Sequence, residues 1–552
     1  MKTIKIVSVS GPHINLVYVD PVNWLLKIFH QNQSHSKNDY VWSNPTFLFR
    51  DNPDNFEMLA NEVERDKVNV LGFSMYIWSR ETILTLAARI KEKFPSLTIV
   101  LGGPEVDAHI NPMFYRHHPY IDYCIYGDGE ESFSLLLDYI AGHNVELVNL
   151  VFRNKIYSHT VFNDRKVLDL SPFITYSSEI KEHLNTIHAD LIKVYKINDL
   201  ELSGDQAWKK IVLVWETTKG CPYSCSFCDW SSGLHNKVRV WGDKSQEIPY
   251  WQQEIDLFFS WNIYYIYWTN PNVGLTPQDR HIVKYWCEKR LNNKRTGPKI
   301  YAPQWSKLKK DVVFELLDLM LSSGVTEFFK ADLQDLDTDV LEKIDRPEVP
   351  WEIHREYIKK LLTKHNITSN ANWQHRLNFI WGLPGQTLDN LRTNLEESGK
   401  LKLYGHHLPF ELIPMSPAAK PAYIEKFKIK IDRVTVVGHS DVFKNESLSR
   451  NWTIDRAVIS NSSLSEKEWF TGIFLFYVYV ALSSKLNLHG RETRIIDNRH
   501  RIQSTIDKSF QYFLTTRRIA IEISGTEKSI YQYVENNIDD LRSFYYLNDE
   551  CG

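Results

Sequence analysis

The sequence predicts an α/β protein with two regions of alternating strands and helices and a mostly helical C-terminal region. Residues 1–150 hold four short apolar runs separated by helical patterns, which is typical of a Rossmann-like, doubly wound parallel sheet. Residues 206–415 repeat the alternation, which predicts a parallel sheet that curls toward a barrel. Between them, residues 151–205 read as a linker with an extension, and residues 416–552 read as helical.

The composition limits the classes of function. The hydrophobic share of 43% and the charged share of 24% are those of folded soluble domains. A formal net charge of -3 argues against a broad nucleic-acid-binding surface. Six cysteines, three of them scattered singly, argue against a secreted disulfide framework. The start of the chain lacks a signal-peptide pattern, and its longest apolar run is shorter than the about twenty residues of a membrane span. We expect a cytoplasmic protein that binds neither nucleic acid nor membranes.

The first region ends its strands in glycine-containing turns. Ligands of doubly wound sheets bind at the carboxyl ends of the strands, and glycine lets a ligand approach the backbone closely. The expected strands are residues 4–9, 68–74, 98–104 and 123–130, and the expected helices are residues 80–94 and 131–141.

The apolar run 211–215, which reads as a buried strand, is followed by three cysteines at CxxxCxxC spacing: Cys221, Cys225 and Cys228. Soft sulfur ligands select zinc or iron–sulfur centres. A closed zinc site needs a fourth protein ligand, and the sequence offers no matching second pair. A four-iron cluster on three cysteines instead leaves one iron open to an external ligand, so we expect a [4Fe-4S] cluster here.

This loop, with Phe227 just before its last cysteine, resembles that of the radical S-adenosylmethionine superfamily. The resemblance implies that the open iron binds S-adenosylmethionine and that the reduced cluster cleaves it to a 5′-deoxyadenosyl radical. It also implies a partial (βα)6 barrel, a C-terminal region that shapes the substrate pocket, and an electron donor such as flavodoxin or ferredoxin.

Three turns of the first region resemble the cobalamin-binding domain of cobalamin-dependent radical S-adenosylmethionine enzymes: residues 72–78, 101–105 and 126–130. The DxHxxG motif, which supplies an axial histidine in many cobalamin proteins, is absent, so cobalamin is expected without histidine ligation. The alternative is a domain that keeps the fold but has lost the cofactor. The resemblance places near the corrin or its nucleotide tail Ser74, Tyr76, Trp78, Gly102, Gly103, Pro104, Gly127, Gly129 and Glu130.

Turns after the later strands resemble the parts of the superfamily that contact S-adenosylmethionine. The expected strands are residues 263–269, 299–303, 327–331 and 377–381. The turn 382–387 resembles a motif near the adenine, although it could be only a tight turn and helix cap. Asn270 stands where related enzymes have an acid, which puts that contact in doubt. The candidate contacts are Asn270, Gln304, Ser306, Gln334, Gly382 and Pro384.

Together these resemblances imply a cobalamin-dependent C-methyltransferase that acts at an unactivated carbon. The sequence of residues 225–230 resembles that of family members that act on peptide or amino-acid-derived substrates in natural-product maturation. A small-molecule or peptide substrate is therefore expected. Two alternatives stay open. The protein could catalyse a cyclisation or rearrangement without net methyl transfer, or it could be a non-catalytic iron–sulfur protein for electron transfer or sensing.

Overall fold

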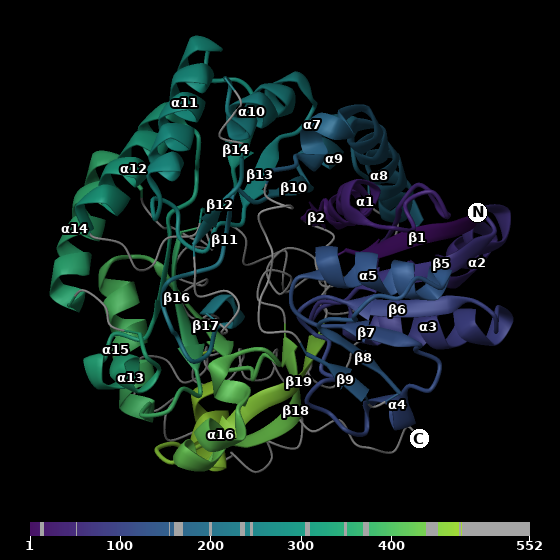
Figure 1. The fold of residues 1–552 in the computed structure, drawn as a ribbon. Coiled ribbons are helices and arrows are strands. Elements are labelled where there is room, and N and C mark those ends of the chain that lie inside the picture. The colour runs from purple at the N-terminus through teal and green to yellow at the C-terminus, as the bar shows by residue number, and fades with distance from the viewer. Residues whose placement is uncertain are drawn as a thin grey trace. The chain divides into compact units, whose positions relative to one another are not determined.

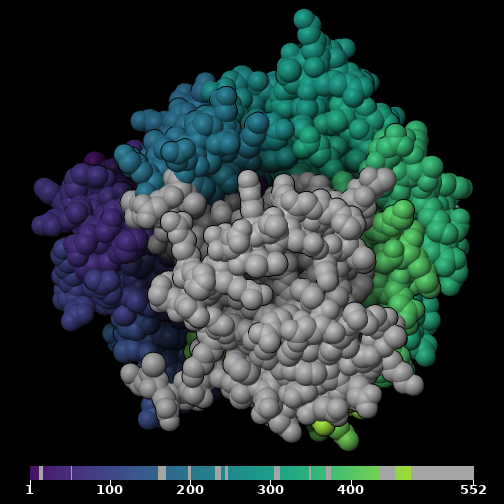
Figure 2. Space-filling view, turned by 180° about the vertical axis from the view of Figure 1, so that it is seen from behind, coloured from purple at the N-terminus to yellow at the C-terminus, as the bar shows by residue number. Residues whose placement is uncertain are grey.

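The computed structural model describes most of the chain, which is coloured in Figures 1 and 2. The chain divides into two compact units. The first unit comprises Met1–Pro222, Asp229–Pro303 and Leu319–Glu327, and the second comprises Tyr223–Cys228, Gln304–Asp318 and Phe328–Gly552. The described residues are 1–10, 16–50, 52–153, 155–158, 169–197, 201–231, 238–242, 247–303, 310–346, 350–367, 375–437, 451–473 and 476.

An eight-stranded sheet in the first unit confirms the doubly wound fold of the N-terminal region. Its order is β3-β1-β5-β6-β7-β8-β9, with β4 also beside β1, and the strands from β3 to β7 are parallel. The antiparallel strands β8 and β9 extend one edge. The bounds are β1 (Lys2–Val9), β3 (Tyr40–Trp42), β4 (Thr46–Leu48), β5 (Val68–Ser74), β6 (Thr98–Gly102), β7 (Tyr123–Ile125), β8 (Leu150–Phe152) and β9 (Lys155–Tyr157).

Helices cover both faces of this sheet (Figure 1). Apolar side chains of β1, β5, β6 and β7 pack against α5 (Gly129–Ala141) and α1 (Val22–Gln33) to form one core. The other face carries α2 (Asn55–Arg65) and α3 (Arg80–Lys93), while the short α4 (Phe114–His117) follows β6. The helices 80–94 and 131–141 expected from the sequence are therefore α3 and α5.

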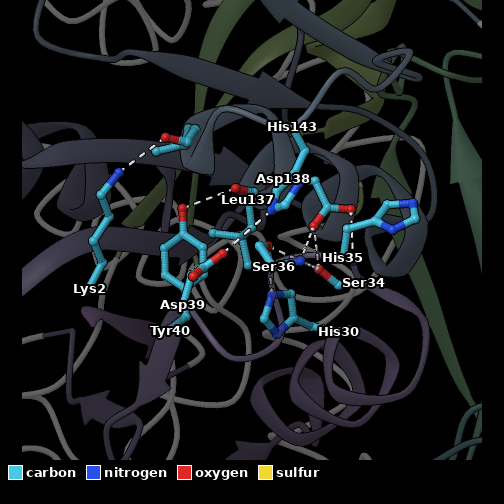
Figure 3. A network of polar contacts seen from close by, with 11 residues as sticks. Lys2, His30, Ser34, His35, Ser36, Asp39, Tyr40, Leu137, Asp138 and His143 are labelled. Atoms are coloured by element: carbon cyan, nitrogen blue, oxygen red, sulfur yellow. Dashed lines mark hydrogen bonds and ion pairs between the residues drawn. The ribbon is translucent and has the colours of Figure 1, made fainter.

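A buried carboxylate on α5 fixes the loop that joins α1 to β3 (Figure 3). Asp138 accepts hydrogen bonds from the Ser34 hydroxyl at 2.5 Å and from the Ser36 backbone N–H at 2.7 Å. Nearby, the buried His30 ring lies 3.4 Å from the Ser36 hydroxyl through Nε2 and accepts from Trp42 Nε1 at 3.4 Å through Nδ1. These bonds give partners to the Ser36 N–H and to polar side chains that would otherwise be buried without them.

A second, parallel sheet in the first unit has the order β14-β13-β10-β2. Its strands β10 (Ile211–Trp215), β13 (Tyr265–Trp268) and β14 (Lys299–Ile300) confirm three strands expected in the second region. The strand β2 (Val17–Val19) was not expected: it comes from the N-terminal region and pairs with β10. Further elements are α7 (Pro172–Thr175), α8 (Ser177–Ile197), α9 (Gly204–Trp208), β11 (Thr218–Lys219), η1 (Asp229–Ser231), β12 (Arg239–Val240), α10 (Tyr250–Ser260) and α11 (Pro277–Asn292).

The second unit contains a three-stranded parallel sheet, β15 (Lys330–Gln334), β16 (Arg376–Trp381) and β17 (Tyr404–Pro409). The helices α12 (Lys310–Ser323), α13 (Thr338–Lys343), α14 (Trp351–Lys364) and α15 (Leu388–Lys400) alternate with these strands along the chain. Closure of the parallel strands of the two units into one partial barrel stays a prediction, as do the domain boundaries.

The described part of the C-terminal region combines helix with sheet. After η2 (Pro417–Ala419) and α16 (Pro421–Phe427), the strands β18 (Lys430–Val437) and β19 (Asn451–Ser460) pair antiparallel, and a helical turn begins after Ser465. The helical expectation for this region did not include this strand pair. None of the helices in the described ranges is long and apolar enough to span a lipid bilayer.

Candidate cofactor site

The carboxyl ends of β5, β6 and β7 bring together the residues predicted to contact cobalamin. Ser74 ends β5 and is buried, and the rings of Tyr76 and Trp78 stack 4.8 Å apart with planes 2° from parallel. Charges of Asp20 and Glu216 add to burial in raising the pKa of Tyr76, so the ends of β2 and β10 lie near this aromatic pair.

Glycines in the next two turns leave backbone open to a ligand. A Cβ at Gly102 or at Gly127 would meet no atom within 4 Å. Gly103 has φ of +106°, and a Cβ there would lie 2.4 Å from the Met75 carbonyl oxygen, so only glycine fits this turn. A Cβ at Gly129 would be in ordinary contact with Leu26 at 3.5 Å. The carboxyl edge of the sheet therefore has open space beside Gly102 and Gly127, which larger side chains at these positions would fill.

The turn after β6 also holds His109, whose ring stacks on Tyr126 with centroids 4.5 Å apart. The neighbouring Pro104 is half-buried. Arg80 on α3 donates to the Glu105 carbonyl at 2.7 Å and to Asp107 at 3.3 Å, which fixes the course of this turn. The ring of His109 is thus engaged by a tyrosine of the β7 turn.

Buried charges connect the β7 turn to the strand before the cysteine loop. The Lys219 ammonium lies 2.6 Å from Glu130 Oε1 and 3.6 Å from Asp128 Oδ1. Burial alone would lower the pKa of Lys219, but the charges of Asp128, Glu130 and Glu216 outweigh it and raise that pKa. Burial raises the pKa of Glu216 to about 7 against the opposing charge of Lys219. Glu130, expected near cobalamin, therefore uses one carboxylate oxygen to hold Lys219.

The cysteine loop is anchored within both units. In the first unit, Asn272 Nδ2 lies 3.7 Å from the Cys221 sulfur. In the second unit, Ser226 donates its N–H to the Ile344 carbonyl at 2.9 Å, and its hydroxyl lies 2.9 Å from the Tyr423 hydroxyl. The Cys228 N–H donates to the Cys225 carbonyl at 3.1 Å, which makes a turn between these two thiols.

Cys221 belongs to the first unit, whereas Cys225 and Cys228 belong to the second. Across the described ranges, no three His, Cys, Asp or Glu side chains are arranged to hold a metal ion. The donor chemistry nevertheless fits an iron–sulfur cluster, because three residues in the thiol form lie within eight positions of one loop. Phe227 packs into the core formed by α13 and its neighbours, beneath the Arg346 guanidinium at 5.9 Å.

Asn270 is fully buried and its amide is engaged by protein. Its oxygen accepts from the backbone N–H groups of Thr217 at 2.9 Å and Thr218 at 3.0 Å, and its nitrogen donates to Asp279 at 3.1 Å. Burial raises the pKa of Asp279 to about 6. Through these hydrogen bonds, Asn270 fixes the position of the segment that leads to Cys221.

Gln334 ends β15 with φ of +70°, where the register with β16 shifts. The turn at Gly382 is closed by Gln386, whose side-chain oxygen accepts from the N–H groups of Gly382 at 2.9 Å and Leu383 at 2.8 Å. A Cβ at Gly382 would lie 3.0 Å from the Val458 carbonyl oxygen and 3.1 Å from Trp469 Nε1, so protein fills that side of the turn.

Gln386 also donates at 2.6 Å to Asp335, a buried carboxyl whose pKa burial raises. Of the acidic residues after β15, Asp335 is therefore buried and not part of a solvated helix start. Pro384 lies within the same turn. Gln304 and Ser306 lie outside the described residues, and their predicted contacts stay predictions.

A polar row crosses one face of the β15-β16-β17 sheet. Asp332 accepts from Asn378 Nδ2 at 2.6 Å and pairs with Lys330 at 3.3 Å, and Asn378 Oδ1 lies 3.2 Å from His406 Nδ1. The alternate residues of β16, such as Phe379, are buried and apolar. Period-two alternation of the strand sequences could have revealed this row, but the sequence analysis did not separate the two faces.

A family model described as B12 binding domain matches residues 46–137, which include β4 to β7 and their turns. This part of the chain is a B12-binding domain. The match covers the turns at Gly102, Gly103, Gly127 and Gly129, where the sequence analysis placed cobalamin.

Two curated relatives are each similar over 74% of the chain. One is the 2-(S-pantetheinyl)-carbapenam-3-carboxylate methyltransferase of Streptantibioticus cattleyicolor, 26% identical over 413 residues. The other is the cobalamin-dependent radical SAM methyltransferase TokK of Streptomyces tokunonensis, 25% identical over 419 residues. The chain covers 55% of each, and so spans about half the length of the curated relatives it matches.

A third relative, the anaerobic magnesium-protoporphyrin IX monomethyl ester cyclase of Synechocystis, is 23% identical over 309 residues, 55% of this chain and 55% of that protein. Among solved structures, the cobalamin-dependent S-adenosylmethionine radical enzyme OxsB with aqua-cobalamin and S-adenosylmethionine bound has a TM-score of 0.56. That match covers 98% of this chain and 75% of OxsB at 12% identity. The fold class is confirmed. The chain is related to two methyltransferases, of which one, TokK, is named a cobalamin-dependent radical SAM methyltransferase.

The residues of the B12-binding domain fit a corrin. The open side of Gly102 and of Gly127 leaves room for a planar ring or a nucleotide tail, and the stacked Tyr76–Trp78 pair is an aromatic surface of the kind that such a ring packs against. The contact of Lys219 with Asp128 was not predicted from the sequence. A signal was present, because Lys219 stands two positions before Cys221 and Asp128 lies inside a turn already chosen as a cobalamin contact.

Proposed function

We propose that the protein is a cobalamin-dependent radical S-adenosylmethionine enzyme that methylates an unactivated carbon. The observation that carries the proposal is a B12-binding domain in the same chain as a three-cysteine loop, with a buried ion pair joining the segments that bear them. The relationship to the two methyltransferases supports three cofactors: a [4Fe-4S] cluster, S-adenosylmethionine and cobalamin.

The chain's own residues would bind and orient these groups. Cys221, Cys225 and Cys228 would hold the cluster, while the turns after β5, β6 and β7 would bind the corrin without a histidine ligand. When bound, the cofactors supply hydrogen abstraction and a transferable methyl group. The protein contributes positioning and the exclusion of water, so no general acid or base is required. Gln334 and the turn at Gly382 stay candidate contacts for S-adenosylmethionine.

Methyl transfer is favoured over cyclisation by the relatives. The two methyltransferases match 74% of the chain, whereas the cyclase matches 55%. A non-catalytic role in electron transfer or sensing is not favoured, because all three relatives carry names of enzymes. The carbapenam carboxylate in the name of the first relative supports a small natural-product precursor as the substrate, alongside the peptide or amino-acid-derived substrate expected from residues 225–230. Flavodoxin or ferredoxin would supply electrons to the cluster.

The test does not need the substrate. The cluster is reconstituted without oxygen, hydroxocobalamin is added, unbound corrin is removed, and S-adenosylmethionine and a reductant follow. We expect retained corrin in the visible spectrum, 5′-deoxyadenosine, and S-adenosylhomocysteine from methylation of the corrin.

A matched pair of variants separates the cluster from general damage. Cys221→Ala should lose cluster iron and deoxyadenosine together. Cys287→Ala removes a buried thiol that accepts from the Ser323 hydroxyl at 3.1 Å outside the loop, and it should keep both. Retained cluster and corrin without deoxyadenosine would contradict the radical reaction, and deoxyadenosine without retained corrin would remove methyl transfer from the proposal.

A further inference from the structure

The ion pair between Lys219 and Glu130 connects two segments that are each proposed to bind a different cofactor. The two residues are 89 positions apart, their charged atoms lie 2.6 Å apart, and their side chains are 10% and 7% exposed. Asp128 Oδ1 approaches the same ammonium at 3.6 Å. Two buried charges and the partly buried carboxylate of Asp128 therefore meet at one point of the first unit.

On one side, the carboxylates belong to the B12-binding domain at the turn where a corrin would approach. Asp128 lies between Gly127 and Gly129, and Glu130 lies in the first turn of α5. The Cβ direction of Gly127 is open. A ligand that fills this opening would fix the backbone that carries both carboxylates.

On the other side, Lys219 lies in β11, two positions before Cys221. The antiparallel partner β12 places Arg239 opposite Lys219. Trp241, the residue that follows β12, lies under the ammonium with its ring centroid at 5.8 Å. The Lys219 ammonium thus contacts two carboxylates and the Trp241 ring, and its backbone continues directly into the cysteine loop.

A buried ion pair contributes little net stability, because desolvation of the charges offsets most of their attraction. The two charges must nevertheless stay close together, because either charge left unpaired in the interior strongly lowers the free energy of unfolding. A pair of this kind between two binding segments links their positions more than it stabilises the fold.

We propose that Lys219 is a positioning residue that couples cobalamin binding to assembly of the iron–sulfur cluster. The inference rests on the proposed binding of both cofactors. A filled cluster site orders the loop from Cys221 and thereby Lys219, which holds Asp128 and Glu130 in the arrangement that receives the corrin. Because such coupling is reciprocal, bound cobalamin favours the cluster by the same factor.

The experiment measures the dissociation constant of hydroxocobalamin by equilibrium dialysis, for the full-length protein with and without a reconstituted cluster. Iron and sulfide contents establish the cluster occupancy. For the wild type we expect the cluster to tighten hydroxocobalamin binding by at least about fivefold. Lys219→Met should abolish this gain, and Lys219→Arg should restore part of it.

Two further variants test whether Lys219 acts through Glu130 and whether the loss of another ion pair has the same effect. Glu130→Gln should behave as Lys219→Met does, and combining the two should cause no further loss of the gain. Lys91→Met is the matched control, because Lys91 pairs with Asp122 at 2.8 Å at the opposite, amino-terminal edge of the same sheet. It should keep the full gain.

The outcomes separate the inference from the proposed function. An equal gain in wild type and Lys219→Met would overturn the coupling role, as would a wild type that binds both cofactors independently. A wild type that holds neither cofactor would overturn the proposed function and this inference together. The ratio of the two dissociation constants is decisive, since a merely structural Lys219 would weaken both states alike.

Discussion

At the scale of single residues, two adjacent glycines have different roles: the fold requires Gly103, whereas cobalamin binding is predicted to require Gly102. Gly103 has φ of +106° and no room for a Cβ, whereas a Cβ at Gly102 would face open space. Gly103→Ala should lower the free energy of unfolding by about 1–3 kcal/mol from backbone strain, with the clash on Met75 in addition.

The neighbouring Gly102→Ala should change stability by less than about 1 kcal/mol. A methyl group in the corrin's path should nevertheless weaken hydroxocobalamin binding roughly tenfold or more. Urea unfolding and equilibrium dialysis measure the two quantities. Unchanged cobalamin binding by a folded Gly102→Ala variant would place the corrin elsewhere.

His30 makes stability depend on pH. Burial lowers its pKa to about 4, against the opposing charges of Asp138 and Asp39, while its Nδ1 must stay unprotonated to accept from Trp42. Between about 6.5 and about 4 the unfolded chain binds a proton that the folded chain does not, so stability falls as the pH drops through this window, by at most about 3 kcal/mol.

His30→Phe should flatten this slope in urea unfolding between pH 7 and pH 4. Because burial also lowers the pKa of His183 to about 4, part of the slope should remain. His35→Phe, which removes an exposed imidazole of the same network, serves as the control and should keep the wild-type slope. An unchanged slope in His30→Phe would show that another group carries the dependence.

At the scale of elements, the turn between β16 and α15 depends on one amide side chain. Gln386 accepts from two backbone N–H groups and donates to Asp335. Gln386→Ala would remove the side-chain oxygen that both N–H groups share and one of the donors to the buried Asp335, which should cost about 2–4 kcal/mol in thermal or urea unfolding. Gln253→Ala, whose amide bonds an exposed carbonyl on the first unit, should cost under about 0.5 kcal/mol.

Elements with a strong local pattern could be predicted from the sequence, and others could not. The strand β5 and the helix α3 follow from apolar periodicity together with the glycine and charged residues around them. The three residues of β2 carry too short a pattern, since their pairing with β10 is set by a strand almost 200 positions away. The strand pair of β18 and β19 lies in a region whose composition favoured helix, and its long-range pairing decided the structure.

The pairing of β2 with β10 can be tested directly. The Val17 N–H donates to the Lys210 carbonyl at 2.7 Å, so Val17→Pro removes a ladder hydrogen bond. We expect faster amide hydrogen exchange over β10 and unchanged exchange over β5, measured by mass spectrometry on peptides that cover each strand. Unchanged exchange over β10 would mean that β2 contributes little to this edge.

At the scale of the whole molecule, the sequence located the candidate site better than it located the contacts within the site. The cysteine loop and the glycine turns are local motifs, and the comparisons support the cofactors they imply. The link from Lys219 to Glu130 joins distant residues, and no local pattern encodes such a pairing. The buried surroundings of Asn270 and Gly382 could not be predicted either, because their neighbours come from other elements of the fold.

The path of the chain through the first unit has a consequence for modular exchange. After β1 in the large sheet, the chain contributes β2 to the other sheet, returns through α1 to the first, and crosses again before β10. No single cut therefore separates the large sheet of residues 1–150 from the second sheet. A chimera that replaces residues 1–150 by the corresponding region of a relative must supply a strand equivalent to β2, or the recipient loses the strand that pairs with the edge of β10.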